Sequence, residues 1–235
     1  RQAIRRSELL RKFDRGIGSE KPALSHRSTV SVAPTTARYN TALHLALRGE
    51  REAAEREFRH LLEVIPDHEN ALGALGLLLL WRGEAEEASR YLRRAVAIDP
   101  QDAVNLARLG MGLRRSGQRA AAADTLHRAL QLDPTLSEPV LELAMMHARS
   151  GRFAAAESLF ARAVRLAPDN AEAHINLGVS RMRQGDLERA AEAYRRAVEL
   201  DPQGARARRY LREALQQGQG DGDTPPSTPT EEPTP

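Results

Sequence analysis

Apolar residues in most of the chain recur every three or four positions, which is the spacing of one helix face. Leu72, Leu75 and Leu79 form one such row. An equivalent row lies further along the chain and consists of Leu106, Leu109 and Leu113. Because an α-helix turns once in about 3.6 residues, each row predicts an amphipathic helix that buries one face.

A second helical pattern follows each row, and in it a small residue precedes a large one by four positions. The pairs are Ala88 and Leu92, Ala122 and Leu126, Ala156 and Phe160, and Ala190 and Tyr194. Alanine allows two helix backbones to approach closely, and the large side chain one turn later fills the space beside it. The two patterns together predict pairs of packed helices.

Glycine and proline divide these patterns at a fixed interval of 34 residues. The glycines are Gly49, Gly83, Gly117, Gly151 and Gly185, and the prolines are Pro66, Pro100, Pro134, Pro168 and Pro202. Glycine readily takes the left-handed conformation of a tight turn, and proline ends a helix because it lacks the N–H that the helix needs. Glycine and proline, the two residues that interrupt helices, each recur five times at this interval. This regularity indicates five tandem helical hairpins.

The hairpins resemble the tetratricopeptide repeat, and counting back from each proline gives their limits. The repeats then span 35–68, 69–102, 103–136, 137–170 and 171–204. The last repeat is a close match to the family motif, with Leu177, Gly178, Ala190, Tyr194, Ala197 and Pro202. The tyrosine that is usual at position 11 is replaced throughout, by Leu45, Leu79, Leu113, His147 and Arg181. The resemblance implies an all-α fold, a right-handed superhelical solenoid of five helix–turn–helix hairpins.

The segments on either side of the repeats differ from them in composition. Residues 205–217 have an apolar stripe and predict one further helix, which would cap the last hairpin. Residues 218–235 hold four acidic residues, no basic residue and many prolines, so we expect a disordered acidic tail. Residues 1–34 hold eight Lys or Arg and three Asp or Glu, a net charge of +5. Within them, 1–15 predict a basic amphipathic helix and 16–34 a linker.

Composition and motifs exclude several kinds of chemistry. The repeat region, 35–217, has a net charge of only +2, whereas nucleic-acid-binding proteins need a concentrated basic face. The absence of cysteine excludes disulfides and thiolate metal sites. None of the seven histidines is arranged as in a zinc hydrolase helix, and neither a glycine-rich phosphate loop nor a nucleophile motif occurs. We therefore expect no enzyme activity, no catalytic residue, no cofactor and no metal.

In the family that these hairpins resemble, the first helices of successive repeats line a concave surface, which implies a partner-binding groove. The implied groove residues are Tyr39, Leu43, Leu77, Trp81, Arg108, Met111, Arg115, Met145, Arg149, Asn176, Val179 and Arg183. The apolar members of this set have two open interpretations, a groove for a peptide or amphipathic helix and packing within the repeats. Arg115, Arg149 and Arg183 share one repeat position, where they could bind a partner or compensate helix dipoles.

The predicted function is a protein–protein interaction scaffold or adaptor that binds a partner peptide or helix in a bacterial assembly process, with a cytoplasmic location favoured. The bacterial assignment rests on composition, because arginine and alanine are abundant while Lys12 and Lys21 are the only lysines. The alternative is an accessory domain of a larger membrane-anchored protein or enzyme, with residues 1–15 beside the membrane. A third interpretation assigns binding of anionic lipid or nucleic acid to residues 1–27. Partner identity and oligomeric state do not follow from the sequence.

Overall fold

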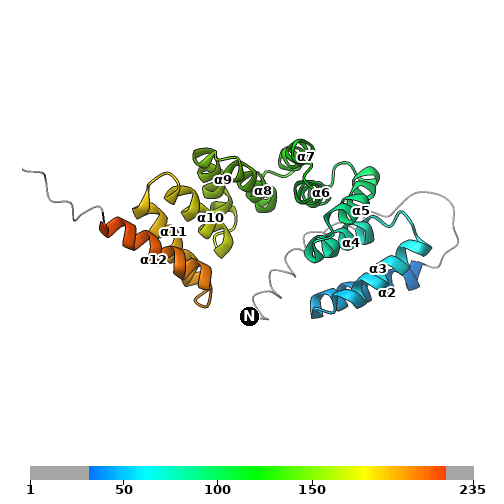
Figure 1. The fold of residues 1–235 in the computed structure, drawn as a ribbon. Helices are drawn as coiled ribbons and strands as arrows, with labels where there is room; N and C mark the ends of the chain where they lie inside the picture. Colours follow the sequence, from blue (N-terminus) through cyan, green and yellow to red (C-terminus); the bar gives the residue numbers. More distant parts are fainter. Residues whose placement is uncertain (1–31, 221–235) are drawn as a thin grey trace, which may run out of the picture. The chain divides into compact units, whose positions relative to one another are not determined.

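The computed structural model of the protein describes residues 32–220, and every regular element within this range is an α-helix. Figure 1 shows the order of the helices. They are α2 (Val32–Arg48), α3 (Arg51–Val64), α4 (Glu69–Arg82), α5 (Ala85–Ile98), α6 (Ala103–Arg115), α7 (Arg119–Leu132), α8 (Ser137–Arg149), α9 (Phe153–Leu166), α10 (Ala171–Met182), α11 (Leu187–Leu200) and α12 (Ala205–Gly220). The all-α prediction and the helical hairpins are confirmed.

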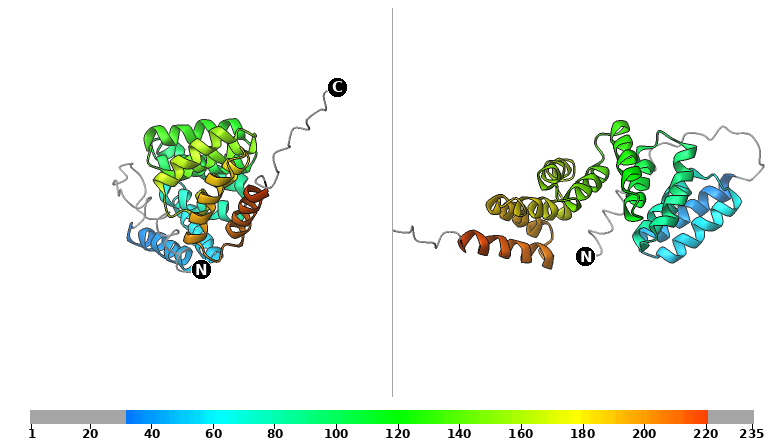
Figure 2. Two further views of the ribbon diagram at one scale, coloured as in Figure 1. Left: turned by 90° about the vertical axis from the view of Figure 1, so that its left-hand side faces the viewer. Right: turned by 45° about the horizontal axis from the view of Figure 1, so that its top comes forward.

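The chain divides into two compact units after Glu142, a point within α8. In the first unit α2 packs on α3, α4 on α5 and α6 on α7, and each hairpin also contacts the next one. Figure 2 shows the two helices of the first hairpin lying side by side. In the second unit α10 packs on α9 and α11, and α11 packs on α12. The additional helix α12 therefore covers the last hairpin, as a capping helix does.

Local chemistry accounts for where the helices begin and end. The Asp102 carboxylate accepts hydrogen bonds from the Val104 and Asn105 amides at 2.8 and 3.0 Å and caps α6, and the Asn170 side chain caps α10 in the same manner. The five turn glycines all have positive φ, between 76° and 89°. This is the left-handed conformation that the sequence predicted for these positions, and it is costly for any residue with a Cβ atom.

Within a hairpin, the first helix presents a small residue to the large side chain of the second helix. A Cβ atom added to Gly110 would lie 2.5 Å from Leu126 Cγ, and one added to Gly178 would lie 2.5 Å from Tyr194 Cε1. Gly76 has the same relation to Leu92. The predicted small residues of the second helices, Ala88, Ala122, Ala156 and Ala190, are all completely buried. The backbones of paired helices thus approach more closely than any larger residue would permit.

Arginine side chains connect neighbouring repeats in a way that the sequence pattern did not predict. Arg94 Nη2 donates to the Pro66 carbonyl at 2.5 Å, and Arg128 Nη2 donates to the Pro100 carbonyl at 2.7 Å. Both arginines lie 28 residues after their acceptor. The proline near the end of one repeat lies in the turn between helices, and its carbonyl accepts a hydrogen bond from the second helix of the next repeat.

The first and last described helices, α2 and α12, extend further toward the chain ends than the sequence predicted. Helix α2 begins at Val32, within the predicted linker, because Pro34 lies in its first turn, where a missing N–H costs no helical hydrogen bond. Helix α12 continues to Gly220 rather than ending at 217, a difference within the usual uncertainty of helix ends. The predicted basic helix of residues 1–15, most of the linker and residues 221–235 lie outside the described residues.

We predict that Gly178→Ala destabilises the second unit. The new methyl group would meet the ring of Tyr194, which is completely buried and has no room to move. Overpacking of this kind costs about 1–3 kcal/mol, which outweighs the roughly 1 kcal/mol that alanine gains over glycine in a helix. Thermal or urea unfolding measures the difference.

Gly218→Ala is the matched control, because Gly218 lies in α12 and an added Cβ atom would have nothing within 4 Å. The same substitution should therefore leave stability unchanged or raise it slightly. Equal effects of the two substitutions would show that close helix packing does not determine the choice of glycine at 178.

Candidate functional site

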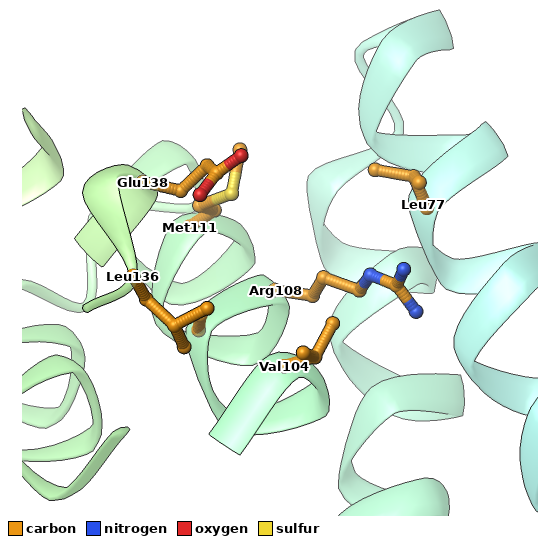
Figure 3. A pocket seen from close by; sticks show the side chains of 7 residues that line it. Leu77, Val104, Arg108, Met111, Leu136 and Glu138 are labelled. Carbon is orange, nitrogen blue, oxygen red and sulfur yellow. The ribbon is translucent and has the colours of Figure 1, made fainter. Parts of the chain in front are cut away.

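The first unit contains an apolar hollow formed by α4, α6 and the beginning of α8. Its lining residues are Leu77, Val104, Ala107, Arg108, Met111, Leu136 and Glu138, and the hollow is partly open to solvent. Figure 3 shows these side chains around the hollow, with Arg108 and Glu138 as its charged members. Five of the seven lining residues are apolar, so the hollow suits an apolar side chain of a binding partner.

Helical spacing explains why α6 supplies most of the hollow. Three lining residues lie three, four and seven positions after Val104, namely Ala107, Arg108 and Met111. This spacing places all four on one face of α6. Leu106 and Leu113 lie on the opposite side and are buried at 2% and 3% exposure. The helix therefore packs through one face and presents the other to the hollow.

The charged residues of the hollow are held by neighbouring polar groups. Arg108 Nη1 donates to Asn105 Oδ1 at 3.3 Å, and Asn105 Nδ2 donates to Asp102 Oδ2 at 2.7 Å. Burial lowers the pKa of Arg108, and the nearby carboxylates of Asp102 and Glu138 oppose this shift. A guanidinium group that is already partly desolvated loses little further hydration when a partner covers it, so a polar contact at this point can add specificity.

The structure brings three of the predicted groove residues together: Leu77, Arg108 and Met111 all line the hollow. Tyr39 is not a lining residue, although its hydroxyl interacts electrostatically with Arg108. Its ring stacks on His68 at 5.3 Å and meets Phe58 at 5.9 Å. Leu43 does not line the hollow. Its side chain is only 6% exposed, because it belongs to the packed core of the first unit.

Trp81 and Arg115 make contacts between repeats. The Arg51 guanidinium lies 5.7 Å from the centre of the Trp81 ring, a cation–π contact from α3 to the end of α4. Arg115 Nη1 donates to the Leu80 carbonyl at 2.6 Å, near the C-terminus of α4. This geometry favours the structural interpretation of Arg115, since a cation at a helix C-terminus compensates the helix dipole.

The other predicted groove residues belong to the second unit. Met145 and Arg149 lie on α8, half-buried and exposed respectively. Val179 packs against the core that includes Ile175 and Tyr194. The remaining two are polar residues of α10 and its end. Asn176 Nδ2 donates to Glu172 Oε1 at 3.2 Å, and Arg183 follows α10 directly and is exposed.

Val104 and Leu136 line the hollow but were absent from the predicted set. Val104 has the second position of its repeat, which belongs to the concave positions that the family resemblance implies, so a strict application of that pattern would have named it. Leu136 precedes α8 rather than lying within a first helix. An apolar residue just before a helix is a known packing position, and this signal could have identified it.

Two further observations concern metal binding and membrane-spanning helices. Among residues 32–220, no group of three or more His, Asp or Glu side chains is arranged to hold a metal ion. No helix in the same range is long and apolar enough to cross a membrane.

The family model described as tetratricopeptide repeat matches residues 39–103 and 141–205, which together exceed half of the chain. The chain belongs to the tetratricopeptide repeat family. Repeats of this family are protein-interaction modules rather than enzymes, so the chain is an interaction scaffold. A search of curated proteins found no match.

Solved structures of other tetratricopeptide repeat proteins share the fold. A thermophilic protein of Thermus thermophilus is 22% identical, with a TM-score of 0.64 over 77% of this chain and 99% of that chain. PilF of Pseudomonas aeruginosa is 21% identical, with a TM-score of 0.65 over 81% of this chain and 93% of that chain. YrrB, described as having an unusual peptide-binding site, is 24% identical, with a TM-score of 0.55 over 74% of this chain and 90% of that chain.

We predict that the first unit loses stability between about pH 7 and pH 5 because His68 becomes protonated. Burial lowers the pKa of His68, and its Nδ1 accepts the Ala71 amide at 3.3 Å to cap α4. The folded chain therefore prefers the neutral ring. This contribution to stability is complete above about pH 6.5, the ordinary histidine pKa, and is lost as the pH falls toward the lowered folded-state value.

Melting temperatures measured across this pH range test the assignment. His68→Asn keeps a side-chain acceptor for the cap and has no proton to gain, so its melting temperature should fall less than that of the wild type. His174, whose pKa is also lowered by burial, retains its own contribution in both proteins. Identical losses in the wild type and His68→Asn would rule out His68 as the titrating group.

Proposed function

We propose that this scaffold binds a peptide or helical segment of a partner protein at the hollow of the first unit, during the assembly of a larger protein complex. The observation that carries the proposal is the combination of an apolar wall, from Leu77, Val104 and Met111, with two charged side chains, Arg108 and Glu138. Apolar anchors provide most of the binding energy at such sites, and a few charged groups fix the orientation of the ligand.

The lining residues of the hollow differ in how much surface they offer to a partner. Leu77 is only 3% exposed although it lines the hollow, whereas Met111 is half-buried. Methionine is flexible and polarisable, so Met111 can adapt to different apolar side chains. YrrB, a protein of the same fold, is described as having an unusual peptide-binding site. That description is consistent with peptide binding by the repeats of this chain.

The alternative interpretation, an accessory domain of a larger membrane-anchored protein or enzyme, depends on residues 1–15, which lie outside the described residues. The hollow is compatible with that setting as well, since it requires only a partner segment that reaches the first helices. The proposed binding at α4, α6 and α8 is therefore independent of whether the repeats act alone or within a larger protein.

We predict that Met111→Glu weakens peptide binding to the full chain by about 2 kcal/mol, or roughly thirtyfold in Kd. A carboxylate in the apolar wall would have to be desolvated beside the bound anchor. Peptides are selected from a random display library against the full chain, and fluorescence anisotropy then gives their Kd for both proteins. Circular dichroism verifies that the variant keeps its helical content.

Leu132→Glu is the matched control, because Leu132 is an apolar residue that is 38% exposed at the end of α7 and has no part in the hollow. It introduces the same charge and should leave the Kd nearly unchanged. Selected peptides that bind Met111→Glu as tightly as the wild type, or that lose affinity only for Leu132→Glu, would place the binding surface elsewhere.

A further inference from the structure

The outer face of the capping helix α12 carries a cluster of exposed arginines. Arg208, Arg209 and Arg212 are exposed and lie at spacings of one, three and four residues, which places them on one face of the helix. The opposite face packs on α11 and α10 through the buried Ala207 and Ala214. We call the exposed surface formed by these three arginines the arginine face.

The arginine face is electrostatically unfavourable for the helix that carries it. Like charges three or four residues apart repel one another on a helix surface. Helix α12 has no acidic residue in its first turn that could offset this charge.

Glu213 lies one turn after Arg209 on α12, and the described residues provide little further compensation for this charge. Arg206, beside the arginine face, pairs with Glu172 of α10 at 2.5 Å. None of the three arginines of the face has an ion pair with a carboxylate within residues 32–220. Arg208 Nη2 lies 3.5 Å from the Gln203 carbonyl, and the Arg209 guanidinium lies 5.1 Å from the centre of the Tyr210 ring. Three guanidinium groups thus remain available to an anionic group.

We propose that the arginine face binds the acidic segment 221–235 of the same chain. This segment follows α12 directly and contains Asp221, Asp223, Glu231 and Glu232 with no basic residue, a net charge of −4. Carboxylates are the natural partners of guanidinium groups, which they can bind in a bidentate geometry. The pairing would neutralise the repulsion within α12 and keep the arginine face from binding other anions.

The length of the segment permits this contact. Helix α12 rises about 1.5 Å per residue, so Arg208 lies about 18 Å along the helix from Gly220. The 15 residues of the segment can span up to about 50 Å when extended, and Glu231 and Glu232 are the eleventh and twelfth of them. A direct covalent connection also gives the segment a high effective concentration at the face, which favours it over a separate acidic peptide.

Paramagnetic relaxation in the full chain tests the proposal. The sequence contains no cysteine, so Thr230→Cys provides a single site for a nitroxide label next to Glu231. At about 0.05 M salt, the amide signals of the first half of α12 should lose about half or more of their intensity, and at about 0.5 M salt they should recover. The Arg208→Gln, Arg209→Gln and Arg212→Gln triple variant should abolish the effect at low salt.

A second triple variant is the matched control, since it removes the same charge from exposed arginines elsewhere in the second unit. It combines Arg152→Gln, Arg165→Gln and Arg195→Gln, and it should keep the broadening of α12. Unbroadened α12 signals at low salt, or broadening that survives in the first triple variant, would overturn the proposal. Broadening of a different surface, or transfer of the effect between labelled and unlabelled copies in a mixed sample, would assign a different contact and would also overturn it.

Discussion

The close approach of two helix backbones within each repeat is the constraint on which the rest of the structure depends. At Gly110 the space for one additional carbon atom is already taken by Leu126, and at Gly178 it is taken by Tyr194. Because the second helix fixes one face of the first helix so tightly, the opposite face is presented in a defined orientation. On α6 that opposite face carries Val104, Arg108 and Met111, so the packing inside the repeat also positions the candidate binding site.

Polar contacts between repeats add to this arrangement, and several of them use backbone carbonyls in the turns and at the helix ends. Arg94 and Arg128 use the carbonyls of the terminating prolines, and Arg115 uses a carbonyl at the end of α4. Carboxylates make similar connections between repeats: Glu55 binds Arg82, and Glu157 binds Arg181 and Arg189. Burial raises the pKa of both carboxyls, but the hydrogen bonds from arginine outweigh it and hold each pKa below its usual value. These contacts favour the charged forms, so they persist at neutral pH.

Much of the fold could be predicted because its signals are local. The turn glycines, the terminating prolines and the small–large pairs each act within one hairpin, and their 34-residue period made them visible. The candidate site was harder to predict, because the exposure of a side chain depends on how the neighbouring repeats pack around it. Leu43 has the same repeat position as Met111, yet it is buried while Met111 lines the hollow. The hydrogen bond from Arg115 to the Leu80 carbonyl joins residues 35 apart in sequence. It could not be predicted from the sequence, because the pattern of side chains does not show which backbone carbonyl will accept a hydrogen bond.

We propose above that a partner protein contacts the exposed face of the first helices of the repeats in the first unit. Photo-crosslinking in the producing cells tests it most directly, with the crosslinking amino acid p-benzoyl-phenylalanine at position 111 in one version of the chain and at position 132 in another. Both residues are apolar and both are on the first unit, but only Met111 lines the hollow. We expect a discrete crosslinked partner from position 111 and none from position 132. The same partner captured from position 132 alone would contradict it, because the second helices would then carry the binding surface.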